Sequence, residues 1–222
     1  MVLNLFSIFD PVSPSIFSSN WLSLLSVTLW VPVTLWASNS RVSYSFIIFL
    51  DTLVGQIGPL MKSMSGILIT VSMFLLILVN NVFGLLPYIF TPTSHPVLPV
   101  TLALVGWLAL FLYTLINFPQ FYMAHLVPTS TPPALLPFMV LIESTSNMIR
   151  PLTLAVRLTA NLVAGHLLLS ILMSASAMVP WVLMPLMAVP QSLLCILELA
   201  VACIQAYVFS ILMTLYYTEM SY

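Results

Sequence analysis

The sequence predicts an all-α polytopic membrane protein with about five membrane helices and one interfacial amphipathic helix. Of its 222 residues, 61% are hydrophobic and 4% are charged, whereas an ordinary soluble domain carries about 25% charged residues. No Asp, Glu, Lys or Arg stands between Lys62 and Glu143. One membrane helix needs about 20 apolar residues, so this stretch is long enough for more than one. We therefore expect the lipid bilayer to surround most of the chain.

The first membrane span is predicted at residues 16–37, and a segment of a different kind follows at residues 42–61. The second segment mixes apolar side chains with polar ones such as Asp51 and lies between Arg41 and Lys62. This pattern favours an amphipathic helix at the membrane surface. By the positive-inside rule, the two basic residues place this segment on the inner side of the membrane and the N-terminus on the other side.

Two further spans are predicted at residues 64–90 and 97–118. A proline-rich stretch at 128–137 then leads into two long apolar segments, at 134–178 and 181–217. Neither an internal repeat nor a soluble domain is evident, so the chain is predicted to form a single integral membrane domain. The missing repeat argues against an inverted-repeat transporter.

The segment at residues 134–178 is too long for an upright span. As one helix it would measure roughly 65 Å, about twice the thickness of the hydrocarbon core. Either Pro151 breaks the segment into two helices, or a single helix crosses the membrane at a steep tilt. The residues alone leave both arrangements open.

Five ionisable residues lie within or beside the last two apolar segments: Glu143, Arg150, Arg157, His166 and Glu198. A charged side chain at the centre of a membrane helix costs about 2.5–3.5 kcal/mol on insertion scales. Such residues therefore usually line a water path or a protein interface. Arg157 has apolar neighbours on both sides and is predicted to lie deepest.

The spacing of these residues predicts which helix faces they share. Glu143, Arg150 and Arg157 are seven residues apart and lie on one face, because seven residues complete almost two helical turns. Asn161 lies one turn beyond Arg157 on the same side, whereas His166 points roughly opposite. The helix thus presents a cationic face to one neighbour and an imidazole to another.

In the last segment Glu198 and Gln205 are also seven residues apart and share a face. Ala202 and Ala206 lie beside them, and such small residues let another helix approach closely. Two interpretations stay open for these charges. Arg157 forms an ion pair with a glutamate that only holds helices together, or it acts on protons. His166 is either a neutral hydrogen-bonded histidine or a proton relay.

Other kinds of functional site find no support in the sequence. Cys195 and Cys203 are eight residues apart on one helix, about 12 Å, so two free thiols are expected. The three histidines are separated from one another and from the cysteines, which argues against a metal site. No phosphate-binding glycine loop or nucleophile arrangement is present. We expect no active site within this chain, no cofactor and no nucleic-acid partner.

Four motifs nevertheless resemble one known family in the correct order. They are RLTANLVAGH at 157–166, LELAVACIQAYVF at 197–209, NNVFGLLPY at 80–88 and HLVP at 125–128. These motifs resemble those of the subunit a family of F-type ATP synthases in its mitochondrial form. The similarity runs along essentially the whole chain, and the first two motifs together are highly specific.

The resemblance implies a stator subunit that lies against a rotor ring of small hairpin subunits, the c-ring. Two aqueous half-channels would open to opposite sides of the membrane, with the essential arginine, here Arg157, between them. The resemblance also implies that the last two helices are strongly tilted, which favours tilt over a break at Pro151.

Five further positions take roles from the resemblance. It places Glu198 and His166 in the proton entry path and Glu143 along the exit path. Asn161 and Gln205 are implied as polar neighbours of the arginine at the ring interface.

The resemblance also implies other membrane and peripheral-stalk subunits as partners, nucleotide chemistry on other subunits, and a place in the mitochondrial inner membrane. The N-terminal region has no basic residue before Arg41, so neither a cleaved signal nor a transit peptide is expected. Two alternatives remain. One is a self-contained proton-coupled secondary transporter that binds an anion at Arg157. The other is a structural membrane subunit of a respiratory complex.

Overall fold

The computed structural model describes residues 9–11, 19–25, 41–61, 63–86, 89–127, 135–176, 178, 180 and 183–220. These residues form helices joined by short turns, with no strand among them. The α-helices are α3 (Arg41–Ile57), α4 (Met64–Gly84), α5 (Val97–Asn117), α6 (Pro119–His125), α7 (Leu136–Ser176) and α8 (Met184–Met220). The predicted all-α fold is confirmed.

Five helical stretches among the described residues are long and apolar enough to cross a membrane: Ser43–Leu60, Met64–Gly84, Val97–Asn117, Leu136–Ser176 and Met184–Glu219. Each contains at least 18 residues, about the length needed to cross the hydrocarbon core. The prediction of a polytopic membrane protein is therefore also confirmed.

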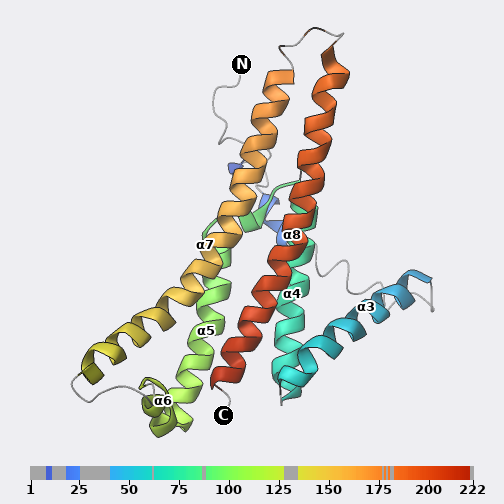
Figure 1. Ribbon diagram of the computed structural model, residues 1–222. Helices are drawn as coiled ribbons and strands as arrows, with labels where there is room; N and C mark the ends of the chain where they lie inside the picture. Colours follow the sequence, from blue (N-terminus) through green and yellow to red (C-terminus); the bar gives the residue numbers. More distant parts are fainter. Residues whose placement is uncertain are drawn as a thin grey trace.

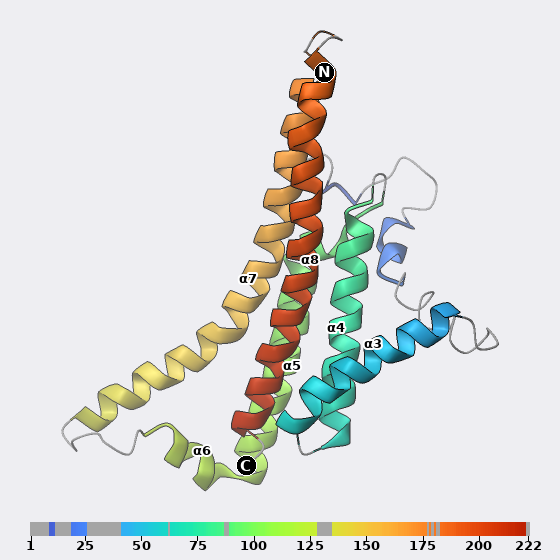
Figure 2. The same cartoon turned by 45° about the vertical axis from the view of Figure 1, so that its right-hand side comes forward.

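The core lies where four of these helices meet. Helix α4 packs mainly on α8 and helix α5 mainly on α7, while α7 and α8 also contact each other. Figures 1 and 2 show α4, α5 and the C-terminal part of α8 beside one another; the middle of α7 meets α5, and its C-terminal part runs on beside α8. The core is apolar, with residues from each helix, including Ile77, Ala103, Trp107, Leu154, Leu158, Ala206 and Phe209.

Helix α4 is shorter than the predicted span at residues 64–90. It begins after Ser63, whose hydroxyl caps the helix by accepting from the Gly66 N–H at 3.3 Å. It ends at Gly84, so the prediction that the span reaches Phe90 is wrong. A Cβ on Gly84 would lie 2.6 Å from the Thr91 side chain, so glycine lets the returning chain pass close to the helix end.

Helix α7 continues through Pro151 without a break, which excludes the alternative of two separate helices. Proline removes one hydrogen bond inside a helix and commonly bends it. The N-terminal part of α7 accordingly leans away from α8, whereas its C-terminal part runs beside α8 (Figure 1). With 41 and 37 residues, α7 and α8 are the longest described helices. Their tilt to the membrane stays a prediction.

Two predictions concern the N-terminal third of the chain. Of the predicted span at 16–37, only Ser19–Leu25 belongs to the described residues, where it forms a 3₁₀ helix. The remainder lies outside them. The predicted amphipathic segment at 42–61 forms helix α3, which projects obliquely from the start of α4 (Figure 2). Its position at the membrane surface stays a prediction.

Candidate functional site

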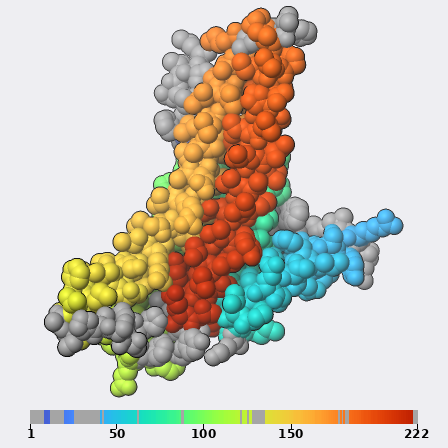
Figure 3. Space-filling view, viewed as in Figure 1, coloured from blue at the N-terminus to red at the C-terminus, as the bar shows by residue number. Residues whose placement is uncertain are grey.

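Helices α7 and α8 run antiparallel and face each other with polar or small residues at three levels. From the connecting loop outward, the pairs are Gly165 with Glu198, Asn161 with Gln205, and Arg150 with Glu219. Together the two helices form one face of the molecule that no other described element covers (Figure 3). The polar contacts along this pair of helices define the candidate site.

Glu198 is buried at the first level, with a residue exposure of 7%. Neither of its carboxylate oxygens makes a hydrogen bond to a described residue. A Cβ on Gly165 would lie 2.9 Å from Glu198 Oε1, so glycine lets the carboxyl lie against α7, and a larger residue would force it to shift. An isolated carboxylate in such surroundings is costly. The group therefore needs either a proton or water.

A cavity of about 240 Å³ lies beside Glu198, between α4, α7 and α8. Its polar lining consists of Asn81, Asn161, Glu198 and Gln205, and the rest is mainly apolar. Both amide atoms of Asn81 and the Gln205 Nε2 are buried without a hydrogen-bond partner among the described residues. Such groups in a cavity of this size suit water, with room for roughly eight molecules.

Asn161 and Gln205 form the second level. The Asn161 Nδ2 donates to the Gln205 Oε1 at 3.3 Å. This bond fixes the side-chain amide of Gln205, which is buried, at the edge of the cavity. The structure thus brings together three of the six predicted site residues, which are Asn161, Glu198 and Gln205.

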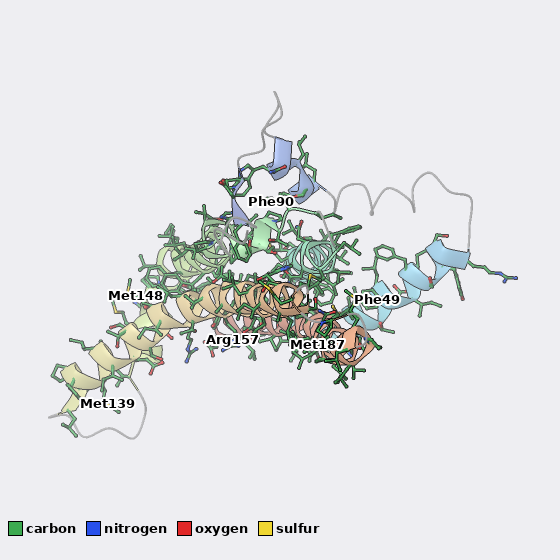
Figure 4. The ribbon with its side chains drawn as sticks, turned by 90° about the horizontal axis from the view of Figure 1, so that it is seen from above. Phe49, Phe90, Met139, Met148, Arg157 and Met187 are labelled. Carbon is green, nitrogen blue, oxygen red and sulfur yellow. The ribbon has the colours of Figure 1, made fainter. Side chains whose placement is uncertain are left out.

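Arg157 lies on α7 between the second and third levels. Its side chain is exposed and points away from α4 and α5 (Figure 4). Among the described residues it forms no ion pair. The structure therefore gives no support to the interpretation that Arg157 only holds two helices together through an ion pair. Neither Glu143 nor Glu198 is its partner. The guanidinium is an uncompensated cation on an apolar helix, one turn from Asn161.

The third level holds an ion pair. Arg150 Nη1 lies 2.8 Å from Glu219 Oε2, and the two side chains are 36% and 42% exposed. This end of the α7–α8 contact is thus charged, whereas Glu198 at the other end has no ionic partner.

Besides Arg157, two predicted site residues lie apart from the cavity. His166 packs edge-on against Phe9, with 6.1 Å between ring centres, and its buried Nε2 has no hydrogen-bond partner among the described residues. Glu143 is half-buried on the part of α7 that leans away from α8. Neither residue lines the cavity.

Sequence reasoning missed two residues that shape the site. Asn81 and Gly165 both lie within recognised motifs, yet neither was predicted to belong to the site. The signal for Asn81 was an amide in the apolar helix of residues 64–84, where a polar side chain needs a partner or water. The signal for Gly165 was a glycine inside a helix, which often marks a close approach.

Comparison with known proteins gives consistent matches over nearly the whole chain. The family model described as ATP synthase A chain matches residues 16–218. A protein named ATP synthase subunit a from Drosophila melanogaster is 47% identical over 224 residues, covering 100% of both chains. Proteins of the same name from Anopheles quadrimaculatus and Aedes aegypti are 46% identical over 226 residues, again with 100% of both chains covered.

Proposed function

Because this chain belongs to the ATP synthase A chain family, we propose that it is the proton-translocating stator subunit of an F-type ATP synthase. In this role it is a multi-pass membrane subunit of the complex, and the nucleotide chemistry takes place on other subunits. One observation carries the mechanism. Arg157 has no ionic partner among the described residues and lies on the face that no described element covers, one helical turn from a polar cavity.

The uncovered face suits a rotor ring of small hairpin subunits as its partner. Besides Arg157 it presents apolar side chains that are more than half exposed, among them Leu152, Val156, Ile196 and Ile204. A carboxylate on the ring can face lipid only when it is protonated, because the ion is too costly there. Opposite Arg157 the ionised form is favoured, since the guanidinium attracts it. Each ring subunit would therefore release its proton as it reaches the arginine.

Arg157 also keeps the two half-channels apart. Arginine does not give up its own proton at working pH, so a proton cannot pass from one side to the other through the guanidinium itself. A lysine could be neutralised and would lose the planar fork. Each proton that crosses supplies about 2.3 kcal/mol per 100 mV, which is comparable to the cost of one charge at the centre of a membrane helix.

The cavity is proposed as part of the entry path. Glu198 has buried oxygens without partners, which suits a group that exchanges protons with water in the cavity. His166 would act nearer the membrane surface and Glu143 along the exit path. Asn161 and Gln205 form the polar edge between the cavity and Arg157. We further propose the mitochondrial inner membrane as the location, with other membrane and peripheral-stalk subunits as partners.

Co-purification tests this proposal. We expect the affinity-tagged chain, extracted in mild detergent, to carry an oligomeric ring of a small hairpin protein with a carboxylate at mid-membrane. In liposomes the intact complex should conduct protons, and the purified chain without the ring should not. Proton-coupled uptake of an anion by the chain alone would instead support the secondary transporter. A purified complex without any ring would support the structural subunit.

A second prediction concerns the Arg150–Glu219 pair. Arg150 lies on nearly the same face of α7 as Arg157 and about 10 Å along the axis. In Glu219→Gln it becomes a second unpaired cation that can hold an ionised rotor carboxylate. An attraction of about 1 kcal/mol slows release roughly fivefold. We expect ATP synthesis in the assembled variant complex to fall by this factor.

The double variant Arg150→Gln/Glu219→Gln distinguishes this effect from a structural one. Removing the freed cation should restore most of the synthesis rate, and Arg150→Gln alone should be milder than Glu219→Gln. ATP synthesis per assembled complex is the measurement. If both single variants lose activity equally and the double variant is no better, the pair only holds the helix ends together.

A further inference from the structure

The cavity beside Glu198 and the charged end at Arg150 and Glu219 are separated by an apolar layer inside the protein. On α8, Phe209 lies one turn beyond the cavity-lining Gln205 and two turns before Tyr216. Because α7 runs antiparallel to α8, the residues that face Phe209 lie between Asn161 and Arg150. This is the same level of the bundle as Arg157.

The side chains of this layer are almost completely buried. Phe209 and Leu154 have 0% exposure, and Leu158 and Ile77 each have 1%. These four residues come from α8, α7 and α4 and belong to one contiguous core. Leu158 also lines the cavity. The floor of the polar cavity is therefore the upper surface of the apolar layer.

Two buried hydroxyls on α8 near Phe209 bond to carbonyls of their own helix. The Ser210 hydroxyl donates to the Tyr207 carbonyl at 2.8 Å, and the Thr214 hydroxyl donates to the Ile211 carbonyl at 2.6 Å. Both side chains are buried. With their protons committed to the backbone, these two hydroxyls do not donate to water. Apolar packing of this density excludes water.

We propose that this layer, centred on Phe209, is an insulating septum that blocks proton passage between the two half-channels behind Arg157. The inference rests on the proposed function and extends it. The Arg157 guanidinium lies on the uncovered face and blocks proton passage only along that face. Water could otherwise connect the cavity with the Arg150–Glu219 end through the protein interior. The septum blocks this second route. A proton in the cavity can then leave only by transfer to a rotor carboxylate or by returning along the entry path.

The test measures proton conductance in complexes whose ring cannot carry protons. The rotor carboxylate is replaced by its amide, and the complex is reconstituted in liposomes with a potassium-driven membrane potential. With Phe209 present, we expect conductance close to that of empty liposomes. Phe209→Ser removes the aromatic side chain and adds a polar group, so water can enter the layer. We expect its conductance to rise about tenfold or more above the Phe209 complex.

Three further variants make the result specific. Phe209→Leu keeps the layer apolar, so its proton conductance should stay close to that of empty liposomes. Phe111→Ser makes the same chemical change on α5, where the ring stacks on Trp107, and should stay tight as well. Leu154→Ser opens the layer from α7 and should leak, which also keeps the test possible if Phe209→Ser does not assemble.

The outcomes separate this inference from the proposed function. If complexes with Phe209→Ser and Leu154→Ser conduct no more protons than the complex with Phe209 present, the septum is overturned. The stator role would be untouched by this result. Equal leakage from Phe111→Ser would overturn it too, because the leak would then reflect general loosening. If the unmodified complex with an intact carboxylate ring conducts no protons, the proposed function itself is wrong.

Discussion

Replacing Arg157 by alanine is expected to abolish ATP synthesis while the complex still assembles. The side chain is exposed and makes no ion pair within the described part of the chain, so its removal leaves no buried partner unsatisfied. Without the cation, an ionised rotor carboxylate at this depth loses its stabilisation. A charge at the centre of a membrane helix costs about 2.5–3.5 kcal/mol, so its ionised population falls on the order of 100-fold. Proton release to the exit side would then become too rare to drive rotation.

The measurement compares ATP synthesis per assembled complex in energised vesicles. Arg41→Ala removes a similar charge at the start of α3, far along the chain from the site, and serves as the matched control. We expect it to keep normal synthesis. Arg157→Lys should also fail to restore normal coupling, because lysine can be neutralised and lacks the planar fork. Near-normal synthesis in Arg157→Ala would rule out the proposed mechanism.

Much of the fold followed from composition and the spacing of polar residues. Long apolar runs predicted helices that agree with α5, α7 and α8 to within a few residues, because each run is long and bounded by polar or proline-rich stretches. The predicted end of α4 was wrong because hydropathy does not detect where a helix ends. Leu86 and Phe90 are as apolar as the helix itself. The close approach of Thr91 to Gly84 is a tertiary contact that no local pattern reveals.

The candidate site was predictable where it depends on helical periodicity. The spacing of seven residues predicted that Glu198 and Gln205 share one face of their helix, and both line the cavity. The same rule placed Glu143 on the face of Arg157, yet Glu143 lies on the part of α7 that leans away. Periodicity assumes a straight helix, whereas α7 contains Pro151 and bends.

Other parts of the site depend on how helices meet, and a single sequence does not contain that information directly. The contact between Arg150 and Glu219 joins residues 69 positions apart. The cavity wall formed by Asn81 likewise requires α4 to pack on α8. Recognising such contacts needs the register of one helix against another. That register is set by small residues such as Ala206, which is fully buried, and such residues occur at many other positions.

Glu198→Gln is expected to slow proton flux strongly while the complex stays intact. Glutamine has nearly the same shape, so it fits against Gly165 as the carboxyl does. It cannot, however, take up and release a proton. A positioned acid or base typically contributes 10²- to 10⁴-fold to a proton transfer. Because water in the cavity can carry part of the flux, we expect a loss of about tenfold or more.

Proton flux through the reconstituted complex, measured under a fixed membrane potential, distinguishes a relay from a packing role at Glu198. Glu198→Asp keeps a carboxyl on a shorter side chain and should recover part of the flux, which a purely structural role would not predict. Gly165→Ala tests the geometry instead. The added Cβ would lie 2.9 Å from Glu198 Oε1 and must displace the carboxyl, so flux should fall without loss of the acid. Unchanged flux in Glu198→Gln would remove this residue from the proton path and leave the cavity to water alone.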